Sequence, residues 1–303
     1  MTEGGSRRLR PAWVTPAVLS ATWLSIASGM AQFTVTAVIG DVAARFGASG
    51  ATGAVAGQLG RSATSVGTAL AVIRLTSLAS LPAAAIADRM GRRRTLIAMT
   101  VVGLGLTVLA ALAPGFWWFV ALVALARPAM SAVNALAGVV VSEETRTRDR
   151  SAAIGLVTAA YGIGAGLVAL LRGAVPDGLD FRAVTALSLV PLVLLPLLVH
   201  RLDEPVLAGR VTARPEHRLP GRVPRRYLRA TVVLGIVTGA IALGTGPAFT
   251  YLFVYGERVL GMSPATLSLL VVGAGPFGLT GLLIGRAGAD RIGRAPTAGL
   301  TMA

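Results

Sequence analysis

Eight long apolar segments restrict this chain to a membrane fold. A helix needs about 20 apolar residues to cross the hydrocarbon core of a bilayer, which is about 30 Å thick, and a helix satisfies its own backbone polar groups in lipid. With 54% hydrophobic and 14% charged residues, the chain is too apolar for a soluble domain. The sequence therefore predicts an all-α, polytopic membrane protein. The predicted spans are residues 13–38, 64–87, 95–112, 116–141, 152–171, 181–199, 230–255 and 265–287.

The arginines predict how these spans are oriented. The chain has a net charge of +15 and no lysine, so all 28 basic residues are arginine. If successive spans alternate in direction, 21 arginines fall on one side of the membrane and five on the other. Basic residues concentrate in cytoplasmic loops, so we predict a multi-pass protein of the cytoplasmic membrane with a cytoplasmic N-terminus. Because the arginines lie between apolar segments, membrane lipid is an expected partner and nucleic acid is not.

Polar stretches divide the chain into two unequal parts. Residues 201–229 contain four prolines and eight arginines, which predicts a basic cytoplasmic linker. This linker separates an N-terminal six-helix bundle, residues 1–200, from a partial C-terminal bundle, residues 230–303. The second part would hold the seventh and eighth spans and the start of a ninth. Between the first two spans, residues 41–61 are rich in Gly, Ala and Ser, and we expect them to form an outer loop with one surface helical turn.

A short charged motif follows the second span and recurs 202 residues later after the eighth. Each copy reads Asp-Arg-x-Gly-Arg. The glycine allows a sharp turn, and the acid and arginines can pair with helix ends and loop charges that shift when two helix bundles rock. We predict that both copies form gating loops. The alternative, that arginines such as Arg93 and Arg94 only anchor the cytoplasmic side, stays open. The gating candidates are Asp88, Arg89, Gly91, Arg92, Asp290, Arg291, Gly293 and Arg294.

Together, the six-span unit, the basic linker and the repeated motif resemble the major facilitator superfamily of secondary transporters. The family motif is Gly-x-x-x-Asp-Arg-x-Gly-Arg-Arg, and Ala84 and Arg286 stand at its leading glycine in the two copies. The resemblance implies two six-helix bundles around a cavity. It also implies that the charged end of the fourth span is a partner for Asp88. Because this fold has twelve spans, we predict a chain truncated after its eighth helix. The charged residues at the end of the fourth span are Glu143, Glu144, Arg146 and Arg150.

Two arginines deep inside predicted spans are the leading candidates for contact with a substrate. Arg74 in the second span and Arg127 in the fourth lie at the same depth. A buried guanidinium costs at least about 2.5 kcal/mol unless it faces water or a partner. Ser131 and Asn134 follow Arg127 at helical spacing, so the three side chains share one face. We predict that this face lines a cavity. Snorkelling of both arginines to the outer headgroups is the alternative.

Two further polar positions are candidates for the cavity wall. Gln32 in the first span either contacts a solute or forms hydrogen bonds between helices, and the sequence does not separate these roles. Thr245 lies in the segment Gly-Thr-Gly-Pro at residues 244–247. That segment predicts an interruption of the seventh helix, with freed backbone groups that a cavity or packed protein must satisfy.

The ionisable residues favour transport over catalysis. The chain has no cysteine and no Walker motif, and its acids and histidines do not cluster, so we expect no enzyme, metal site or cofactor. No acid lies deep in a span; a coupling carboxylate would be absent or a boundary group such as Asp41 or Glu257. We predict a secondary transporter that moves a small-molecule substrate by alternating access, with proton-coupled efflux of a drug or metabolite as the first candidate. The alternatives are a truncated, non-transporting membrane protein and an anion uptake carrier that uses Arg74 and Arg127.

Overall fold

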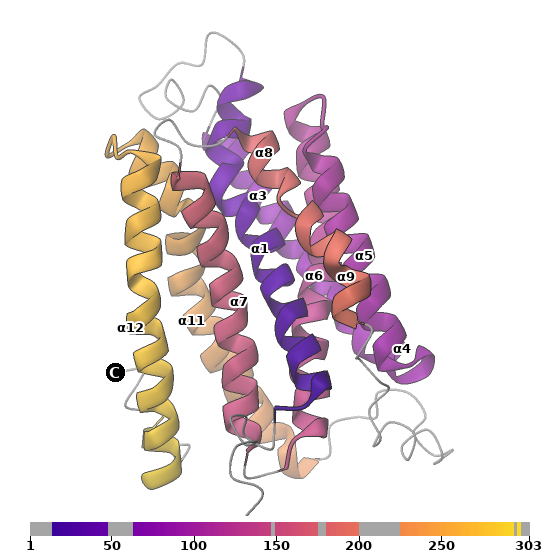
Figure 1. Cartoon of the computed structure of the whole chain (residues 1–303). Helices are drawn as coiled ribbons and strands as arrows, with labels where there is room; N and C mark the ends of the chain where they lie inside the picture. Colours follow the sequence, from indigo (N-terminus) through magenta and orange to yellow (C-terminus); the bar gives the residue numbers. More distant parts are fainter. Residues whose placement is uncertain are drawn as a thin grey trace, which may run out of the picture.

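The computed structural model of the chain consists of long helices that lie side by side (Figure 1). It describes residues 14–47, 63–146, 149–174, 180–199, 225–293 and 296–297. We call the end of the molecule at which α1 ends the upper end, as drawn in Figure 1, and the opposite end the lower end. The helices are α1 (Pro16–Arg45), α3 (Ala63–Thr76), η1 (Ser77–Ser80), α4 (Leu81–Met90), α5 (Arg92–Ala110), α6 (Phe116–Glu144), α7 (Arg150–Gly173), α8 (Phe181–Ala186), α9 (Leu189–Val199), α11 (Arg225–Arg258) and α12 (Pro264–Arg291).

Every predicted span coincides with helical structure. Within the described ranges, seven helical segments are long and apolar enough to cross a membrane. The remaining predicted span, residues 181–199, is a shorter apolar segment formed by α8 and α9. The all-α membrane fold predicted from the apolar segments is therefore confirmed. Most of the predicted linker, residues 201–224, lies outside the described ranges, and α11 begins at Arg225.

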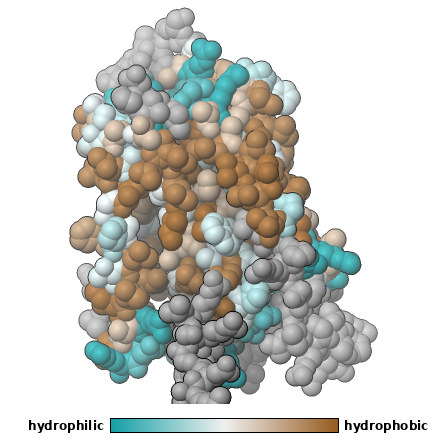
Figure 2. Space-filling model, in the orientation of Figure 1, coloured by the Kyte–Doolittle hydropathy of each residue, from teal (hydrophilic) through white to brown (hydrophobic). Residues whose placement is uncertain are grey.

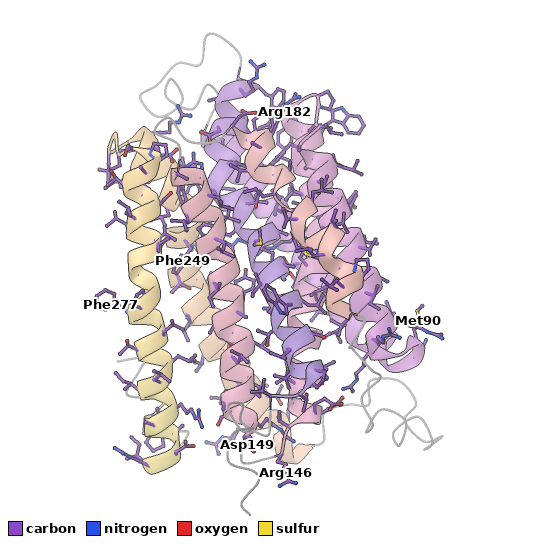
Figure 3. The ribbon with its side chains drawn as sticks, viewed as in Figure 1. Met90, Arg146, Asp149, Arg182, Phe249 and Phe277 are labelled. Carbon is purple, nitrogen blue, oxygen red and sulfur yellow. The ribbon has the colours of Figure 1, made fainter. Side chains whose placement is uncertain are left out.

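Apolar side chains form a broad band across the middle of the face seen in Figure 2. Figure 2 shows this band between hydrophilic residues at the upper and lower ends. Figure 3 shows Arg146 and Asp149 at the lower end and Arg182 at the upper end, with Phe249 and Phe277 between them. Phe277 is 80% exposed in the isolated chain. Lipid solvates a large aromatic surface of this kind and water does not, which fits a multi-pass membrane protein.

Helix α1 is the centre of the packing. It contacts α6, α7, α8 and α11, and 78% of its most apolar stretch is buried. Two glycines allow α1 and α7 to approach closely: a Cβ on Gly29 would meet the backbone of Tyr161, and one on Gly164 would meet the backbone of Ile26. Small residues favour tight helix contacts in membranes, where van der Waals packing is a main source of helix association. This contact fixes α7 against α1 next to the candidate site.

Helix α1 is longer than predicted. Residues 41–45, part of the segment predicted as an outer loop with one surface helical turn, are helical but continue α1, while 48–62 lie outside the described ranges. The helix continues because residues 41–45 contain no glycine or proline, and the first glycine after them, Gly47, comes just beyond the C-cap Phe46. The additional turn brings Asp41 to the upper end of the molecule, where other helices end.

Helix α11 is continuous through residues 244–247, where an interruption was predicted. The prediction was wrong because Pro247 removes only one backbone donor from a helix of 34 residues. Threonine hydroxyls nearby add bonds to the same helix: Thr245 Oγ1 donates to Ile241 O at 2.8 Å, and Thr250 Oγ1 donates to Gly246 O at 2.6 Å. In a bilayer an interrupted helix would leave several backbone groups without partners. The continuous helix is therefore the more stable form.

The second span changes helix type near its middle. Residues 77–80 form the 3-10 helix η1 between α3 and α4. Pro82 follows near the start of α4, and in a continuous α-helix its ring would clash with the carbonyl group of Leu78, four residues earlier. A short 3-10 segment is a common way to relieve such strain. The change of helix type affects the site directly, because Ser77 belongs to this segment.

Candidate functional site

The predicted polar face of α6 is present in the structure. Arg127, Ser131 and Asn134 are all partly exposed, while Met130 and Val133 between them are buried. This alternation is expected when one side of a helix packs on a core and the other does not. Helix α6 therefore has a polar side that the apolar core of the first six spans leaves accessible.

A hydrogen bond joins Arg127 to the second span. Its Nε donates to Ser77 Oγ at 3.3 Å. Ser77 is the first residue of η1, so the segment in which the helix changes type supplies the acceptor. The sequence analysis did not single out Ser77. The signal for it was the proline five residues later, which predicts a local change in the helix around residues 77–80.

Arg74 contacts a different helix. Its Nη2 donates to the hydroxyl group of Thr250 on α11. Thr250 is 5% exposed, whereas Arg74 is exposed. The contact links the second span to the seventh and directs the guanidinium group toward a neighbouring helix. It therefore lies at a boundary between the first six spans and the helices that follow the linker.

Arg74, Arg127 and Tyr161 of α7 lie within electrostatic range of one another. Arg127 interacts electrostatically with Tyr161 and with Arg74, and Tyr161 interacts with both arginines. Each of the three lies 11 or 12 residues from the upper end of its helix, which is roughly 16 to 18 Å along the helix axis. Three helices thus bring polar side chains to one depth, and Thr250 of α11 contacts one of them. We call Arg74, Ser77, Arg127, Tyr161 and Thr250 the middle cluster.

The other predicted cavity residues have partners of a different kind. Gln32 is buried, and its Nε2 donates to Ser28 Oγ at 2.9 Å; Ser28 Oγ in turn donates to Met130 O of α6 at 2.9 Å. This chain of bonds is the interhelical arrangement that the sequence left open. Thr245 is exposed and its hydroxyl donates to its own helix. A contact between a solute and either residue stays a prediction.

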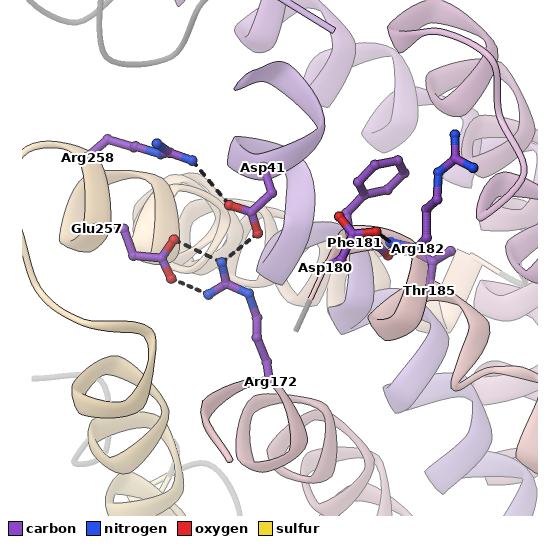
Figure 4. Close-up of polar contacts among 8 residues, drawn as sticks. All are labelled: Asp41, Arg172, Asp180, Phe181, Arg182, Thr185, Glu257 and Arg258. Atoms are coloured by element: carbon purple, nitrogen blue, oxygen red, sulfur yellow. Dashed lines mark hydrogen bonds and ion pairs between the residues drawn. The ribbon is translucent and has the colours of Figure 1, made fainter. Parts of the chain in front are cut away.

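A second charged cluster lies at the upper end and was not predicted as a unit. Figure 4 shows Arg172, at the end of α7, between two acids. Its Nη2 donates to Asp41 Oδ2 of α1 at 2.7 Å and to Glu257 Oε2 of α11 at 2.9 Å, while Nη1 pairs with the other oxygen of Glu257. Arg258 Nη2 donates to Asp41 Oδ1 at 3.2 Å. We call Asp41, Arg172, Glu257 and Arg258 the upper cluster.

The upper cluster is balanced in charge and largely shielded from water. Arg172 is 2% exposed, and its guanidinium carbon lies 5.1 Å from the centre of the Phe253 ring. Two-point pairing with a carboxylate and contact with an aromatic ring are both typical of buried arginines. Asp41 and Glu257 were predicted as acids at a membrane boundary, but their arginine partners were not predicted. The available signal was that arginines lie at the same predicted membrane depth as the two acids. Among the described residues, no three acidic or histidine side chains are grouped to hold a metal ion.

The first copy of the charged motif forms a sharp turn at the lower end. Gly91 has φ of 92°, a conformation that strains any residue with a side chain. Arg92 pairs with Glu143 at the end of α6, so the charged end of the fourth span does contact this loop. Arg89 is exposed, and the side chain of Asp88 lies outside the described residues. The gating role of the loop stays a prediction.

The second copy has the same backbone feature. Gly293 has φ of 95°, close to the value at Gly91 in the first copy. Arg291 is the last residue of α12, and within that helix Arg286 Nε lies 4.0 Å from Asp290 Oδ2. Arg294 lies outside the described residues. Repeated glycines in one unusual conformation indicate that the two copies share a local structure, which supports an internal repeat.

The profile of the Major Facilitator Superfamily matches residues 21–303. The chain belongs to this superfamily. The resemblance drawn from the repeated motif is therefore confirmed, and membership of the major facilitator superfamily places the chain among transporters rather than enzymes. A search of curated proteins gave no match.

Solved structures of the major facilitator superfamily share this fold. A crystal structure of a D-xylose–proton symporter is 15% identical, with a TM-score of 0.64; the match covers 92% of this chain and 70% of that chain. A bacterial homologue of the human lysosomal transporter Spinster, in an inward-facing and unoccupied conformation, is 16% identical with a TM-score of 0.52. That match covers 94% of this chain and 62% of that chain. At these identities the likeness concerns the fold alone.

Proposed function

We propose that this chain moves a small solute across the cytoplasmic membrane by alternating access, with the upper cluster as the gate on the outer side. One observation carries the proposal: the upper cluster connects α1 and α7 of the first six spans to α11, which follows the predicted linker. In a carrier built from two bundles, a contact of this kind must hold one end closed and must also be able to open.

The charges of the upper cluster suit a contact that opens and closes. Asp41 and Arg172 lie on the first six spans, and Glu257 and Arg258 both lie on α11. Each side therefore carries one acid and one arginine. If the helices separate, the pair of Asp41 and Arg172 can persist, and water can hydrate the charges on α11. The remaining pair and this hydration partly offset the free energy needed to break the ion pairs between the first six spans and α11. A cluster with unequal numbers of acids and arginines on one side would leave a charge without this compensation.

Side chains of α11 are buried near the upper end and exposed toward the lower end, as expected for a carrier that is closed at one end only. Near the upper end, Phe253 and Val254 are buried against the first six spans. Toward the lower end, Val232, Ile236 and Leu243 are 50%, 66% and 80% exposed. The described helices therefore meet α11 at the upper end and leave its lower part uncovered. This arrangement supports a conformation that is closed above and open below.

The distribution of arginine supplies the orientation in this proposal. The described ends of the arginine-rich connections, such as Arg146 in Figure 3, lie at the lower end, which would make that end cytoplasmic and the upper end external. Protons are the candidate coupling ions, and Asp41 and Glu257 are the candidate carboxylates, because a proton on either acid would remove one of the charges that hold Arg172. Proton-coupled efflux of a drug or metabolite is the finer version of the proposal.

Distance measurements between spin labels test alternating access without knowledge of the substrate. The chain has no cysteine, so labelled cysteine pairs can be introduced at exposed positions: Arg45→Cys with Val259→Cys for the upper end, and Arg146→Cys with Leu228→Cys for the lower end. We expect Arg172→Gln to lengthen the upper distance and shorten the lower one. Arg182→Gln, an exposed arginine of the upper end outside the cluster, is the matched control.

Two outcomes would contradict the proposal. If neither distance responds to Arg172→Gln, the upper cluster does not control the conformation. If the upper end opens while the lower end stays unchanged, the helices separate without the opposite movement that alternating access requires. Either result would favour the alternative of a non-transporting membrane protein. Repeating the measurement at low and neutral pH tests the proton, since coupling predicts that acid alone opens the upper end.

A further inference from the structure

We propose that Arg74 and Arg127 bind an anionic group of the transported solute, a carboxylate or a phosphate. This inference rests on the proposed transport function and names the substrate class for the middle cluster. Its basis is that two guanidinium groups from different helices lie at one depth and within electrostatic range of each other, and that their described hydrogen bonds are to neutral oxygens.

The contacts of the two arginines leave their charge uncompensated. Arg127 donates to a serine hydroxyl at 3.3 Å and Arg74 donates to a threonine hydroxyl. The electrostatic neighbours of Arg127 are the phenol of Tyr161 and the guanidinium group of Arg74. Among the side chains that the structure describes, no carboxylate pairs with either arginine. Two like charges within electrostatic range of each other raise the energy of the empty site, and an anion near both would lower it.

Both arginines have unused N–H donors and are accessible to a ligand. A guanidinium group has five N–H donors in a planar fork that matches a carboxylate or a phosphate. The bonds described above use one donor of each arginine. Arg74 is exposed and Arg127 is partly exposed, so a ligand can approach both. The hydroxyl groups of Ser77 and Thr250 hold the two forks in place beside the approach.

The depth of the site argues for a solute over a lipid headgroup. Both arginines lie 11 residues below the upper ends of their helices, roughly 16 Å along the axis. Arg127 lies three residues above the middle residue of α6, roughly 5 Å along the axis, so it lies inside a hydrocarbon core about 30 Å thick. The phosphates of lipids lie at its surfaces. A solute that enters between the helices would bring its anionic group to this level.

Thermal melting of the purified protein in neutral detergent tests the site. The probes are benzoate, succinate and inorganic phosphate at constant ionic strength, each compared with chloride, and benzamide is the uncharged match for benzoate. A fourth arm adds phosphatidylglycerol. We expect at least one of the three small anions to raise the melting temperature, by roughly 3 °C at tenfold its dissociation constant. We expect benzamide to have no effect.

Substitutions assign any effect to the two arginines. Arg74→Gln and Arg127→Gln should each abolish the rise, and Arg182→Gln, which removes the same charge elsewhere, should keep it. The proposal is overturned if no small anion raises the melting temperature, if the rise persists in both variants, or if only phosphatidylglycerol acts through the arginines. The melting assay does not depend on transport, so it separates the two proposals. If an anion binds but the spin-label distances at the two ends do not change in opposite directions, the anion site is supported and the proposed transport function is contradicted.

Discussion

The upper and middle clusters both connect the first six spans to α11, but they balance charge in different ways. The upper cluster has two arginines and two acids in contact. The middle cluster has two arginines bonded to hydroxyl groups. Paired charges hold helices together, whereas two arginines within electrostatic range repel each other and, in a membrane span, keep the cost of an unpaired charge. We infer that the upper cluster serves contact between helices and that the middle cluster serves binding.

Arg172→Met should give the largest effect and would test the first half of this comparison. The substitution leaves Asp41 and Glu257 near each other without their shared arginine. Removing one partner of a buried ion pair costs about 3–5 kcal/mol, so the free energy of unfolding in detergent should fall by about 3 kcal/mol or more. Arg172→Met with Glu257→Gln should recover part of the loss. A fall below about 1 kcal/mol would show that water already compensates these charges.

Arg127→Met should change the free energy of unfolding less than Arg172→Met does, and it should not lower it. It removes the repulsion from Arg74 and the cost of a buried cation, while it gives up one hydrogen bond of about 1 kcal/mol to Ser77. The free energy of unfolding should therefore stay the same or rise by about 1 kcal/mol, and the amount of protein in the membrane should not fall. Transport should nevertheless be lost. A loss of more than about 2 kcal/mol would mean that the middle cluster is structural, and the contrast with the upper cluster would disappear.

Arg258→Gln should give the smallest effect and would sharpen the description of the upper cluster. Arg258 is 32% exposed and contacts Asp41 at 3.2 Å, whereas Arg172 is nearly buried. An accessible ion pair contributes about 0–1 kcal/mol, so the free energy of unfolding should fall by less than about 1 kcal/mol. If Arg258→Gln were as damaging as Arg172→Met, the cluster would act as one unit of four charges and not as a central arginine with two acids.

The features predicted correctly from the sequence depend on local or one-dimensional rules. The spans were found because bilayer thickness sets the length of an apolar helix. The polar face of α6 was found because residues at helical spacing share a side. The family followed from two copies of one motif, and both copies turn at a glycine with positive φ. Each of these properties is determined within a short stretch of chain or by its repetition.

The errors and omissions have a different cause. Residues 244–247 contain every local signal for a helix break, yet α11 continues through them, because a continuous helix keeps its backbone bonds in an apolar medium. Asp41 was expected in a loop, but it lies in α1 beside Arg172. Whether such residues meet depends on which helices are neighbours, and close packing at glycines such as Gly29 decides that in three dimensions.

The apolar segments and the repeated motif are sufficient to identify a helical membrane protein of the major facilitator superfamily, and residue spacing is sufficient to predict two arginines at one depth. The partner of each charge depends on how the helices pack. This packing brought the ends of α1, α7 and α11 together into a balanced cluster, and it left Arg74 and Arg127 with hydroxyl partners. The physical reason is that hydropathy acts along the chain, whereas the energy of a buried charge depends on partners that helix packing brings from distant positions in the sequence.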